Sequence, residues 1–260
     1  MSILNITTIQ TDILWENKAA NLAMFEKKIS SLKETTEVVI LPEMFSTGFS
    51  MNPGIHAEKM DGPTLKWMKA ITAAKKIILT GSAIIEEEGK YFNRLIWMLP
   101  DGQYGYYDKR HLFAYANEDK HYTAGNKRLI ASVKGWKINL QVCYDLRFPV
   151  WSRQQAVGEF DVLVYVANWP DRRSLAWKTL LRARAIENQC YVVGVNRIGE
   201  DGNNISYSGD SMMIDPLGEV LFEKSKEESI FTYGLQKEKL EEVRMKFPFW
   251  KDADHFFIEP

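Results

Sequence analysis

The chain has 260 residues, of which 45% are hydrophobic and 26% are charged, the composition of a folded protein with a sizeable core. Its formal net charge is −1, so no overall positive field would gather nucleic acid, and no nucleic-acid partner is expected. Two cysteines outside any CxxC pair argue against a disulfide scaffold, and four scattered histidines predict no metal site.

The first residues lack the basic region and the small-residue cleavage site of a secretory signal. The longest apolar runs, such as 160–166, have the length of a strand and are too short to span a bilayer. We therefore expect a cytoplasmic protein with no membrane partner.

Strand-like and helix-like segments alternate along the chain. A proline at position 63 suits the first turn of a helix, and the unbroken apolar run at 160–167 is typical of a strand buried on both faces. The predicted strands are 3–10, 38–41, 77–85, 92–99, 104–108, 137–142, 160–167, 190–195, 211–214 and 220–222, and the predicted helices are 17–32, 63–74, 150–157 and 175–188.

No linker, low-complexity segment or internal repeat divides the chain, so we expect a single domain over residues 1–260. Strands that alternate with helices, mixed with hairpins, indicate an α/β fold with two packed sheets or one large mixed sheet. Residues 236–260 are expected to form a C-terminal helix and an aromatic tail that docks on its own core or on a second subunit. The tail contains Phe247, Phe249, Trp250, Phe256 and Phe257.

Three predicted strands are followed directly by a chemically reactive side chain. Glu43 follows the strand at 38–41, Lys109 follows the strand at 104–108, and Cys143 follows the strand at 137–142. In open α/β sheets, ligands collect outside the carboxyl ends of strands. A carboxylate, an ammonium and a thiol at three such ends therefore predict one site.

These three groups suit acyl transfer from a carbon–nitrogen bond through a thioester. A free thiol is only a few per cent ionised at neutral pH, and Glu43 can take its proton if burial raises the pKa of the carboxyl group. Lys109 would favour the thiolate and hydrogen-bond the oxyanion of a tetrahedral intermediate. The backbone N–H of Tyr144, the residue after the thiol, is the expected second oxyanion donor.

Three segments resemble the three catalytic motifs of the nitrilase, or carbon–nitrogen hydrolase, superfamily, in order and in spacing. They are LPEMF at 41–45, YDKRHL at 107–112 and VCYDLRFP at 142–149. The segments YVANWP at 165–170 and RARAIENQ at 182–189 are similar to the bacterial omega-amidase branch. The likeness runs from residue 3 to about residue 222, which is nearly the whole chain.

The resemblance implies a four-layer α-β-β-α sandwich that assembles into a homodimer or a higher homo-oligomer through its outer helices. It implies Glu43 as general base, Lys109 as oxyanion stabiliser and Cys143 as nucleophile. A second family glutamate falls on Glu118, in a stretch that reads as a loop. The implied enzyme is a cofactor-free amidase whose small-molecule substrate is the terminal amide of a 2-oxo dicarboxylic acid, such as 2-oxoglutaramate or 2-oxosuccinamate.

Aromatic and basic residues near the three motifs are candidates for a substrate pocket. Phe49, Phe113, Tyr115 and Trp169, together with Phe45, are expected to wall it. Arg172 and Arg173, just past a buried strand, would grip a substrate carboxylate in bidentate fashion. The alternative is a surface charge pair at the start of a helix.

Other interpretations of the same residues stay open at this stage. His111 would form a Cys–His dyad with Cys143, although a structural role is preferred. Asp145 and Arg147 are expected to pair with neighbours and hold the turn after Cys143, and Cys190 is expected to pack in the core. The rival functions are hydrolysis of a nitrile, an N-carbamoyl amino acid or deaminated glutathione, binding without catalysis, and metal-dependent hydrolysis.

Overall fold

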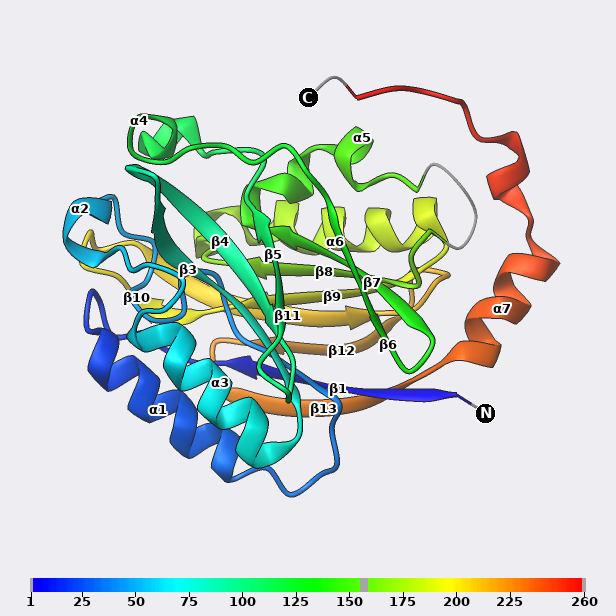
Figure 1. Cartoon of the computed structure of the whole chain (residues 1–260). Coiled ribbons are helices and arrows are strands. Elements are labelled where there is room, and N and C mark those ends of the chain that lie inside the picture. Colours follow the sequence, from blue (N-terminus) through cyan, green and yellow to red (C-terminus); the bar gives the residue numbers. More distant parts are fainter. Residues whose placement is uncertain (1, 155–158, 259–260) are drawn as a thin grey trace.

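The computed structural model describes residues 2–154 and 159–258, and its strands form two sheets (Figure 1). The strands of the first sheet are β1 (Ile3–Gln10), β2 (Val38–Ile40), β3 (Ile78–Glu87), β4 (Lys90–Met98), β5 (Tyr104–Asp108) and β13 (Ser229–Gln236). Those of the second are β6 (Leu129–Val133), β7 (Trp136–Val142), β8 (Val162–Ala167), β9 (Tyr191–Asn196), β10 (Ile198–Glu200), β11 (Ser206–Ile214) and β12 (Val220–Ser225). The spatial orders are β13-β1-β2-β3-β4-β5 and β10-β11-β9-β8-β7-β6, with β12 paired to β11.

Short and long helices connect these strands and cover the sheets. The α-helices are α1 (Lys18–Ser30), α2 (Pro53–His56), α3 (Pro63–Lys75), α4 (Glu118–His121), α5 (Pro149–Ser152), α6 (Ser174–Asn188) and α7 (Lys237–Lys246). The 3-10 helices are η1 (Ala114–Ala116), η2 (Cys143–Arg147), η3 (Asp171–Arg173) and η4 (Phe249–Asp252). Helix α3 shows how local sequence sets the bounds: it begins at Pro63, whose fixed φ suits the first turn, and ends where Lys76 adopts a left-handed φ of 55°.

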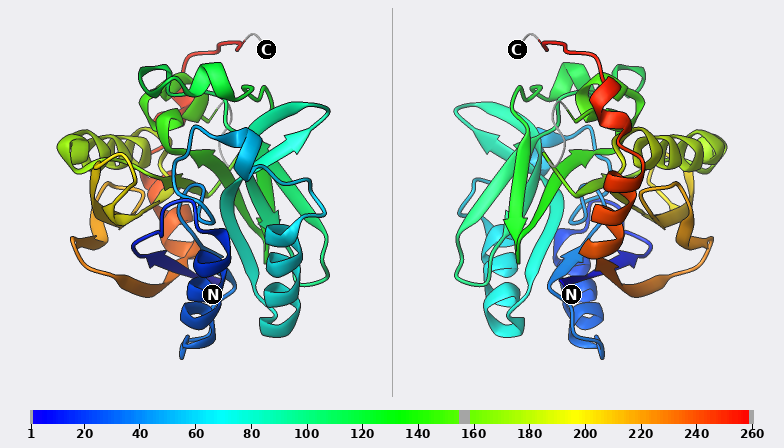
Figure 2. Two further views of the ribbon diagram at one scale, coloured as in Figure 1. Left: turned by 90° about the vertical axis from the view of Figure 1, so that its left-hand side faces the viewer. Right: turned by 90° about the vertical axis from the view of Figure 1, so that its right-hand side faces the viewer.

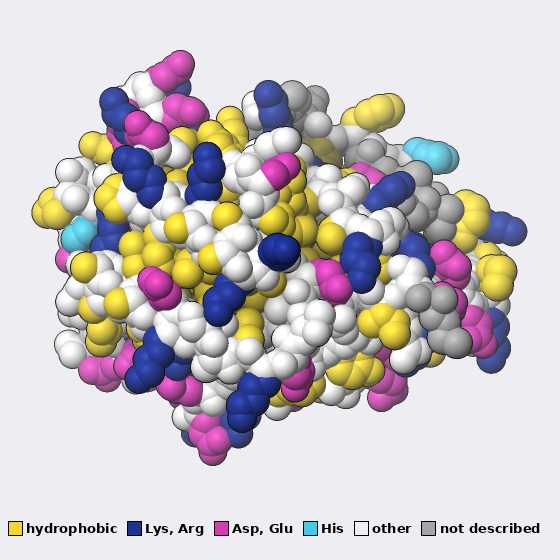
Figure 3. All heavy atoms as spheres, turned by 60° about the horizontal axis from the view of Figure 1, so that its bottom comes forward, with side chains coloured by type: hydrophobic (Ala, Val, Ile, Leu, Met, Phe, Trp, Pro, Cys, Tyr) yellow, Lys and Arg dark blue, Asp and Glu magenta, His cyan; other side chains and the backbone are white. Residues whose placement is uncertain are grey.

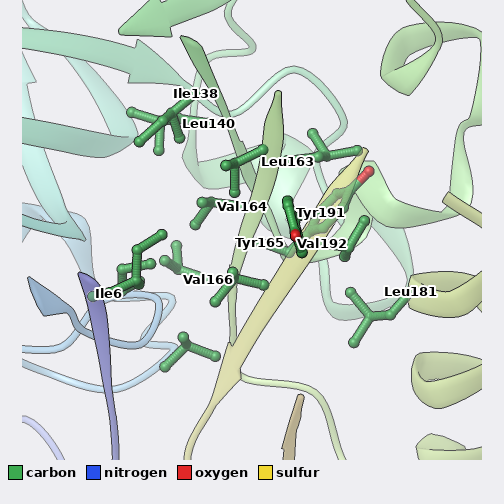
Figure 4. Close-up of a cluster of buried hydrophobic side chains, with 14 of the residues drawn as sticks. Ile6, Ile138, Leu140, Leu163, Val164, Tyr165, Val166, Leu181, Tyr191 and Val192 are labelled. Carbon is green, nitrogen blue, oxygen red and sulfur yellow. The ribbon is translucent and has the colours of Figure 1, made fainter. Parts of the chain in front are cut away.

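The main core lies between the two sheets. In Figure 4, Val164 and Val166 of β8 point toward Ile6 of β1, whereas Leu163 points away, to the side where Leu181 of α6 lies. This is the two-residue alternation of a strand whose two faces are both buried.

A second cluster of apolar side chains fills the outer face of the first sheet. Phe25 of α1 and Met68 of α3 are buried there against Val39 and Leu79. Figures 1 and 2 show α1 and α3 on this side and α6 on the far side of the second sheet. The layers therefore run helices, sheet, sheet, helix, and the predicted α-β-β-α sandwich is confirmed.

The strand directions bring the predicted reactive residues to one edge. β1, β2 and β3 are parallel, β4 is antiparallel to β3, and β5 is antiparallel to β4, so β5 ends at the same edge as β2. In the second sheet β7, β8 and β9 are parallel and also end together. The segments after β2, β5, β7 and β8 therefore converge.

The structure differs from the sequence prediction in several elements. The predicted helix 150–157 is shortened to α5, and Arg153 after it has extended backbone angles; residues 155–157 of that prediction lie outside the described residues. The stretch at 118–125, expected as a loop, begins with the short helix α4. Strands β6, β10 and β13 were not predicted; β13 pairs with β1 along eight residues, a contact between the two ends of the chain.

The C-terminal segment consists of α7 and η4, followed by an extended stretch. Phe249 is 64% exposed and Phe257 is fully exposed, so these two aromatic side chains contact little of the chain. The single domain and the docking of the tail both stay predictions.

The surface carries charges of both signs. On the face in Figure 3, Lys and Arg side chains are interspersed with Asp and Glu. Among the described residues, no helix combines the length and the apolar character needed to cross a membrane.

Candidate active site

The centre of the site is a buried cluster of one ammonium and two carboxylates. Glu43 lies three residues beyond β2, Lys109 directly follows β5, and Glu118 begins α4; each is 0% exposed. Lys109 Nζ is 2.9 Å from Glu43 Oε1 and 2.9 Å from Glu118 Oε2. The structure therefore brings Glu118, which the resemblance gave as a second glutamate, against the same nitrogen as Glu43.

Burial and charge act in opposite directions on this cluster. Burial alone would lower the pKa of Lys109, but the charges of Glu118 and Glu43 outweigh it and raise that pKa well above its ordinary value. Burial raises the pKa of Glu118, and the ammonium of Lys109 opposes that rise. Lys109 is consequently a permanent cation at physiological pH.

Asparagine and backbone N–H groups complete the hydrogen bonds of Glu43. Its Oε1 accepts from Asn93 Nδ2 at 2.8 Å as well as from Lys109, and its Oε2 accepts from the backbone N–H of Asn168 at 2.8 Å. Asn168 Nδ2 also donates to the backbone carbonyl of Glu43 at 2.6 Å. The carboxylate is thus held from both sheets, since β4 carries Asn93 and Asn168 follows β8.

Cys143 occupies a sharp turn between β7 and η2. Its φ of 44° is unusual for a residue with a side chain and is tolerated only where the surroundings hold it. Its Sγ lies 4.0 Å from the carbonyl oxygen of Asn168, the residue whose backbone N–H donates to Glu43 Oε2. The next residue, Tyr144, lies in the first turn of η2, where backbone N–H groups have no partner within the helix.

The thiol of Cys143 is protonated in the resting protein. Burial raises its pKa well above the ordinary value and Glu43 adds to the rise, whereas Lys109 lowers it. Lys109 thus favours the thiolate, as expected, but burial and Glu43 outweigh it. A base has to remove the proton when the thiol reacts.

Asp145 holds the turn that carries Cys143. Its two carboxylate oxygens accept hydrogen bonds from the backbone N–H of Val142, the hydroxyl of Tyr107, and the backbone and ring nitrogens of His111. The His111 ring also stacks on Phe148 at 3.7 Å. His111 is thus engaged with Asp145, and no contact with the thiol is found in the described part of the chain, which leaves the Cys–His alternative without support.

A cavity of about 450 Å³ opens beside Cys143 and Tyr144. It is lined by six of the seven residues predicted for a substrate pocket: Phe49, Phe113, Tyr115, Trp169, Arg172 and Arg173. Phe45 is the exception, because it lies in the core against Phe25 and Trp67. Phe49 of the cavity wall has its ring centroid 5.1 Å from Lys109 Nζ, so the cavity lies next to the charged cluster.

The cavity has a cationic wall that the sequence only partly predicted. Arg147 also lines it, with its guanidinium over the Trp169 ring, and Arg173 lies over the Phe113 ring. Among the described residues, the guanidinium groups of Arg147, Arg172 and Arg173 have no ion pair and no hydrogen bond. Arg147 therefore stacks on an aromatic ring, and the expectation that it forms a pair holding the turn after Cys143 is wrong. Burial lowers the pKa of Arg173, and the like charges of Arg172 and Arg147 add to this.

The sequence was compared with protein families and with proteins of known function. The profile of the carbon-nitrogen hydrolase family matches residues 5–245. The chain belongs to this family. Omega-amidase YafV of Escherichia coli (strain K12) is 43% identical over 254 residues, which are 97% of this chain and 98% of that protein. The 2-oxoglutaramate amidase of Bacillus subtilis (strain 168) is 32% identical over 95% of this chain and 96% of its own length.

A solved relative has nearly the same fold. XC1258 from Xanthomonas campestris, a CN-hydrolase superfamily protein with an arsenic adduct in its active site, has a TM-score of 0.97 and 45% identity, and the match covers 100% of both chains. Together with the sequence relatives, it confirms the resemblance to the carbon-nitrogen hydrolases and to their bacterial omega-amidase branch.

Sequence reasoning missed several residues of this carbon-nitrogen hydrolase site. Asn93 was placed only as a strand residue, Asn168 only as part of a motif, and the cavity also contains Trp15, Asn52, Asp201, Asn203 and Tyr207. Asn168 was detectable, because it follows a predicted strand in the same way as Glu43 and Cys143. Within residues 2–154 and 159–258, no group of three or more His, Cys, Asp or Glu side chains is placed to hold a metal ion.

Proposed function

We propose that this carbon-nitrogen hydrolase is an omega-amidase that hydrolyses the terminal amide of small 2-oxo dicarboxylic acid monoamides, 2-oxoglutaramate above all. The relatives named for that activity match nearly the full length of the chain. The observation that carries the proposal is a buried Glu–Lys–Cys cluster beside a cavity with three arginines whose guanidinium groups have no ion pair among the described residues.

The reaction begins with acylation of the enzyme. Glu43 takes the proton of the Cys143 thiol, and the thiolate attacks the amide carbon. Lys109 Nζ and the backbone N–H of Tyr144 stabilise the oxyanion that forms. Glu43 then returns its proton to the nitrogen, the C–N bond breaks, and ammonia leaves a thioester on Cys143.

Hydrolysis of the thioester uses the same groups again. Glu43 accepts a proton from water, and the hydroxide that forms attacks the thioester carbon. The second tetrahedral intermediate breaks its C–S bond, and the thiolate recovers the proton from Glu43. The products are ammonia and a dicarboxylic acid. Glu118 accepts two hydrogen bonds from Lys109 and so orients the ammonium for both steps.

The arginines supply recognition of the remote end of the substrate. A 2-oxo acid presents a carboxylate and an adjacent carbonyl group, and the oxygen atoms of both groups accept hydrogen bonds. Guanidinium groups bind carboxylates in bidentate geometry, and Arg172, Arg173 and Arg147 have no competing partner among the described residues. This feature favours an anionic amide over a nitrile or another neutral substrate.

Substrate profiling with ammonia detection tests the proposal. We expect 2-oxoglutaramate and 2-oxosuccinamate to be turned over, and nitriles and N-carbamoyl amino acids to be much poorer substrates. The Cys143→Ala variant should fold and release no ammonia. Retained ammonia release by that variant, or a preference for nitriles, would overturn the assignment.

A further inference from the structure

Asn93 is a fully buried polar residue at the edge where the catalytic groups meet. It lies near the start of β4, and the pairing of Arg94 with Asp108 places it opposite Lys109. Because β4 is antiparallel to its neighbours β3 and β5, its start lies at the edge where β5 ends. The strand direction thus inserts an asparagine among the charged groups.

The contacts of Asn93 reach all three members of the charged cluster. Its Nδ2 donates to Glu43 Oε1 at 2.8 Å and to Glu118 Oε1 at 3.2 Å. Its backbone carbonyl accepts from the backbone N–H of Lys109 at 3.0 Å. One residue therefore joins the two carboxylates to each other and holds the backbone of the lysine between them.

The carbonyl oxygen of the Asn93 side-chain amide, unlike its nitrogen, makes no hydrogen bond to a described residue. This oxygen, Oδ1, is also buried, and burying an unpaired acceptor costs stability. The opposite orientation of the amide would direct Oδ1 at two carboxylate oxygens, which offer no donor. The hydrogen bonds of this side chain therefore go to Glu43 and Glu118 alone.

We propose that Asn93 is a positioning residue that keeps Glu43 and Glu118 ionised side by side on the single ammonium of Lys109. Two carboxylates in one site repel each other, so one of them tends to take up a proton. A hydrogen-bond donor shared between them stabilises both in the charged form. Glu43 is then ready to accept the proton of Cys143, a role that rests on the proposed function.

The test compares two buried asparagines. Asn93→Leu keeps the approximate volume and removes the donor, and Asn139→Leu is the matched control, because Asn139 on β7 is also 0% exposed and its side chain has no hydrogen bond. For Asn93→Leu we expect kcat with 2-oxoglutaramate to fall roughly 10- to 100-fold, as for lost hydrogen bonds to charged groups. The acid limb of its pH profile should move up by about one pH unit. KM should change less than about twofold, since Asn93 does not line the cavity.

A second arm of the test needs no substrate. The rate at which iodoacetamide alkylates Cys143 reports proton removal by Glu43, and its acid limb should shift upward with the same variant. If Asn93→Leu fails to fold, Asn93→Asp, which has almost the same shape, replaces it. Its added carboxylate should shift the acid limbs of the kcat profile and of the alkylation profile upward by at least as much as expected for Asn93→Leu.

Three results separate the possibilities. Unshifted acid limbs in a folded Asn93 variant would overturn the inference, as would an equal loss of kcat and an equal shift in Asn139→Leu. No turnover of 2-oxoglutaramate by the unaltered enzyme would instead contradict the proposed function, while the alkylation arm would still decide the role of Asn93.

Discussion

At the scale of single residues, Glu43 is the junction of the site. Its carboxylate accepts hydrogen bonds from Lys109, Asn93 and the backbone of Asn168, and its charge raises the pKa of the Cys143 thiol. Because burial keeps that thiol protonated, the cysteine is unreactive until Glu43 takes its proton.

The arginines that line the cavity lead to a prediction about affinity. Replacing Arg147 or Arg173 by methionine should raise KM for 2-oxoglutaramate roughly 10- to 100-fold, because each change removes a charge-assisted hydrogen bond to the substrate. kcat should fall far less, since neither side chain touches the reacting carbon. Arg182→Met, at an exposed position of α6, is the control and should leave KM unchanged. Equal KM values in all three variants would show that the carboxylate binds elsewhere.

The charge of Lys109 leads to a prediction about alkaline pH. Glu118 and Glu43 outweigh the effect of burial and raise the pKa of Lys109, so the ammonium keeps its proton at pH values where an ordinary lysine begins to lose it. We expect kcat for 2-oxoglutaramate to stay constant from pH 7 to about 9.5. Lys109→Gln should lower kcat by about 10²- to 10³-fold, the usual loss for an oxyanion donor. A decline of kcat below about pH 9 in the unaltered enzyme would contradict this account.

At the scale of elements, the site depends on turns that directly follow strands. Met44, after Glu43, and Cys143 both have positive φ values, 43° and 44°, so each turn bends sharply and directs a side chain into the site. The sequence predicted these positions well, because a short apolar run followed by a polar or reactive residue has a local signature.

Other elements have no such local signature. Asn93 enters the site from the start of an antiparallel strand, and Arg147 reaches the cavity by stacking on Trp169, which follows a different strand. The strand β13 is half exposed along most of its length, so its hydrophobic alternation is weak. These features depend on contacts between distant segments, which the order of residues along one segment does not show.

The turn at Cys143 supports a prediction about stability. Asp145→Asn replaces one acceptor oxygen by a donor in a buried site where four donors converge, so we expect a loss of about 2–4 kcal/mol in the free energy of unfolding. Urea unfolding measures this loss, and kcat should fall together with it. Glu227→Gln, in an exposed ion pair with Lys224, should leave the urea midpoint unchanged. Equal midpoints for the two variants would show that Asp145 does not hold the turn.

At the scale of the whole molecule, the two sheets contribute different parts of one reaction. The first sheet positions Glu43, Asn93 and Lys109, and the second positions Cys143 and Asn168. The four-layer fold and the three reactive groups were predictable because their motifs lie in order along the chain. The shape of the cavity was not, because its wall is assembled from segments that lie as far apart as Trp15 and Tyr207.

The resemblance to the family also predicts a homo-oligomer. Light scattering coupled to size-exclusion chromatography should give a mass that is a multiple of 30.0 kDa. If the exposed aromatic tail docks on a second subunit, a chain that ends at Lys246 should dissociate. A 30.0 kDa particle for the full chain would contradict the oligomer.

The central claim is that Cys143 carries the acyl group during turnover, and mass spectrometry of acid-quenched enzyme tests it most directly. After brief reaction with 2-oxoglutaramate, the account predicts that the peptide containing Cys143 gains the mass of the acyl group. The peptide containing Cys190, which is fully buried in the core, should be unchanged. Steady ammonia release with no adduct on Cys143, or with an adduct on Cys190, would contradict the account.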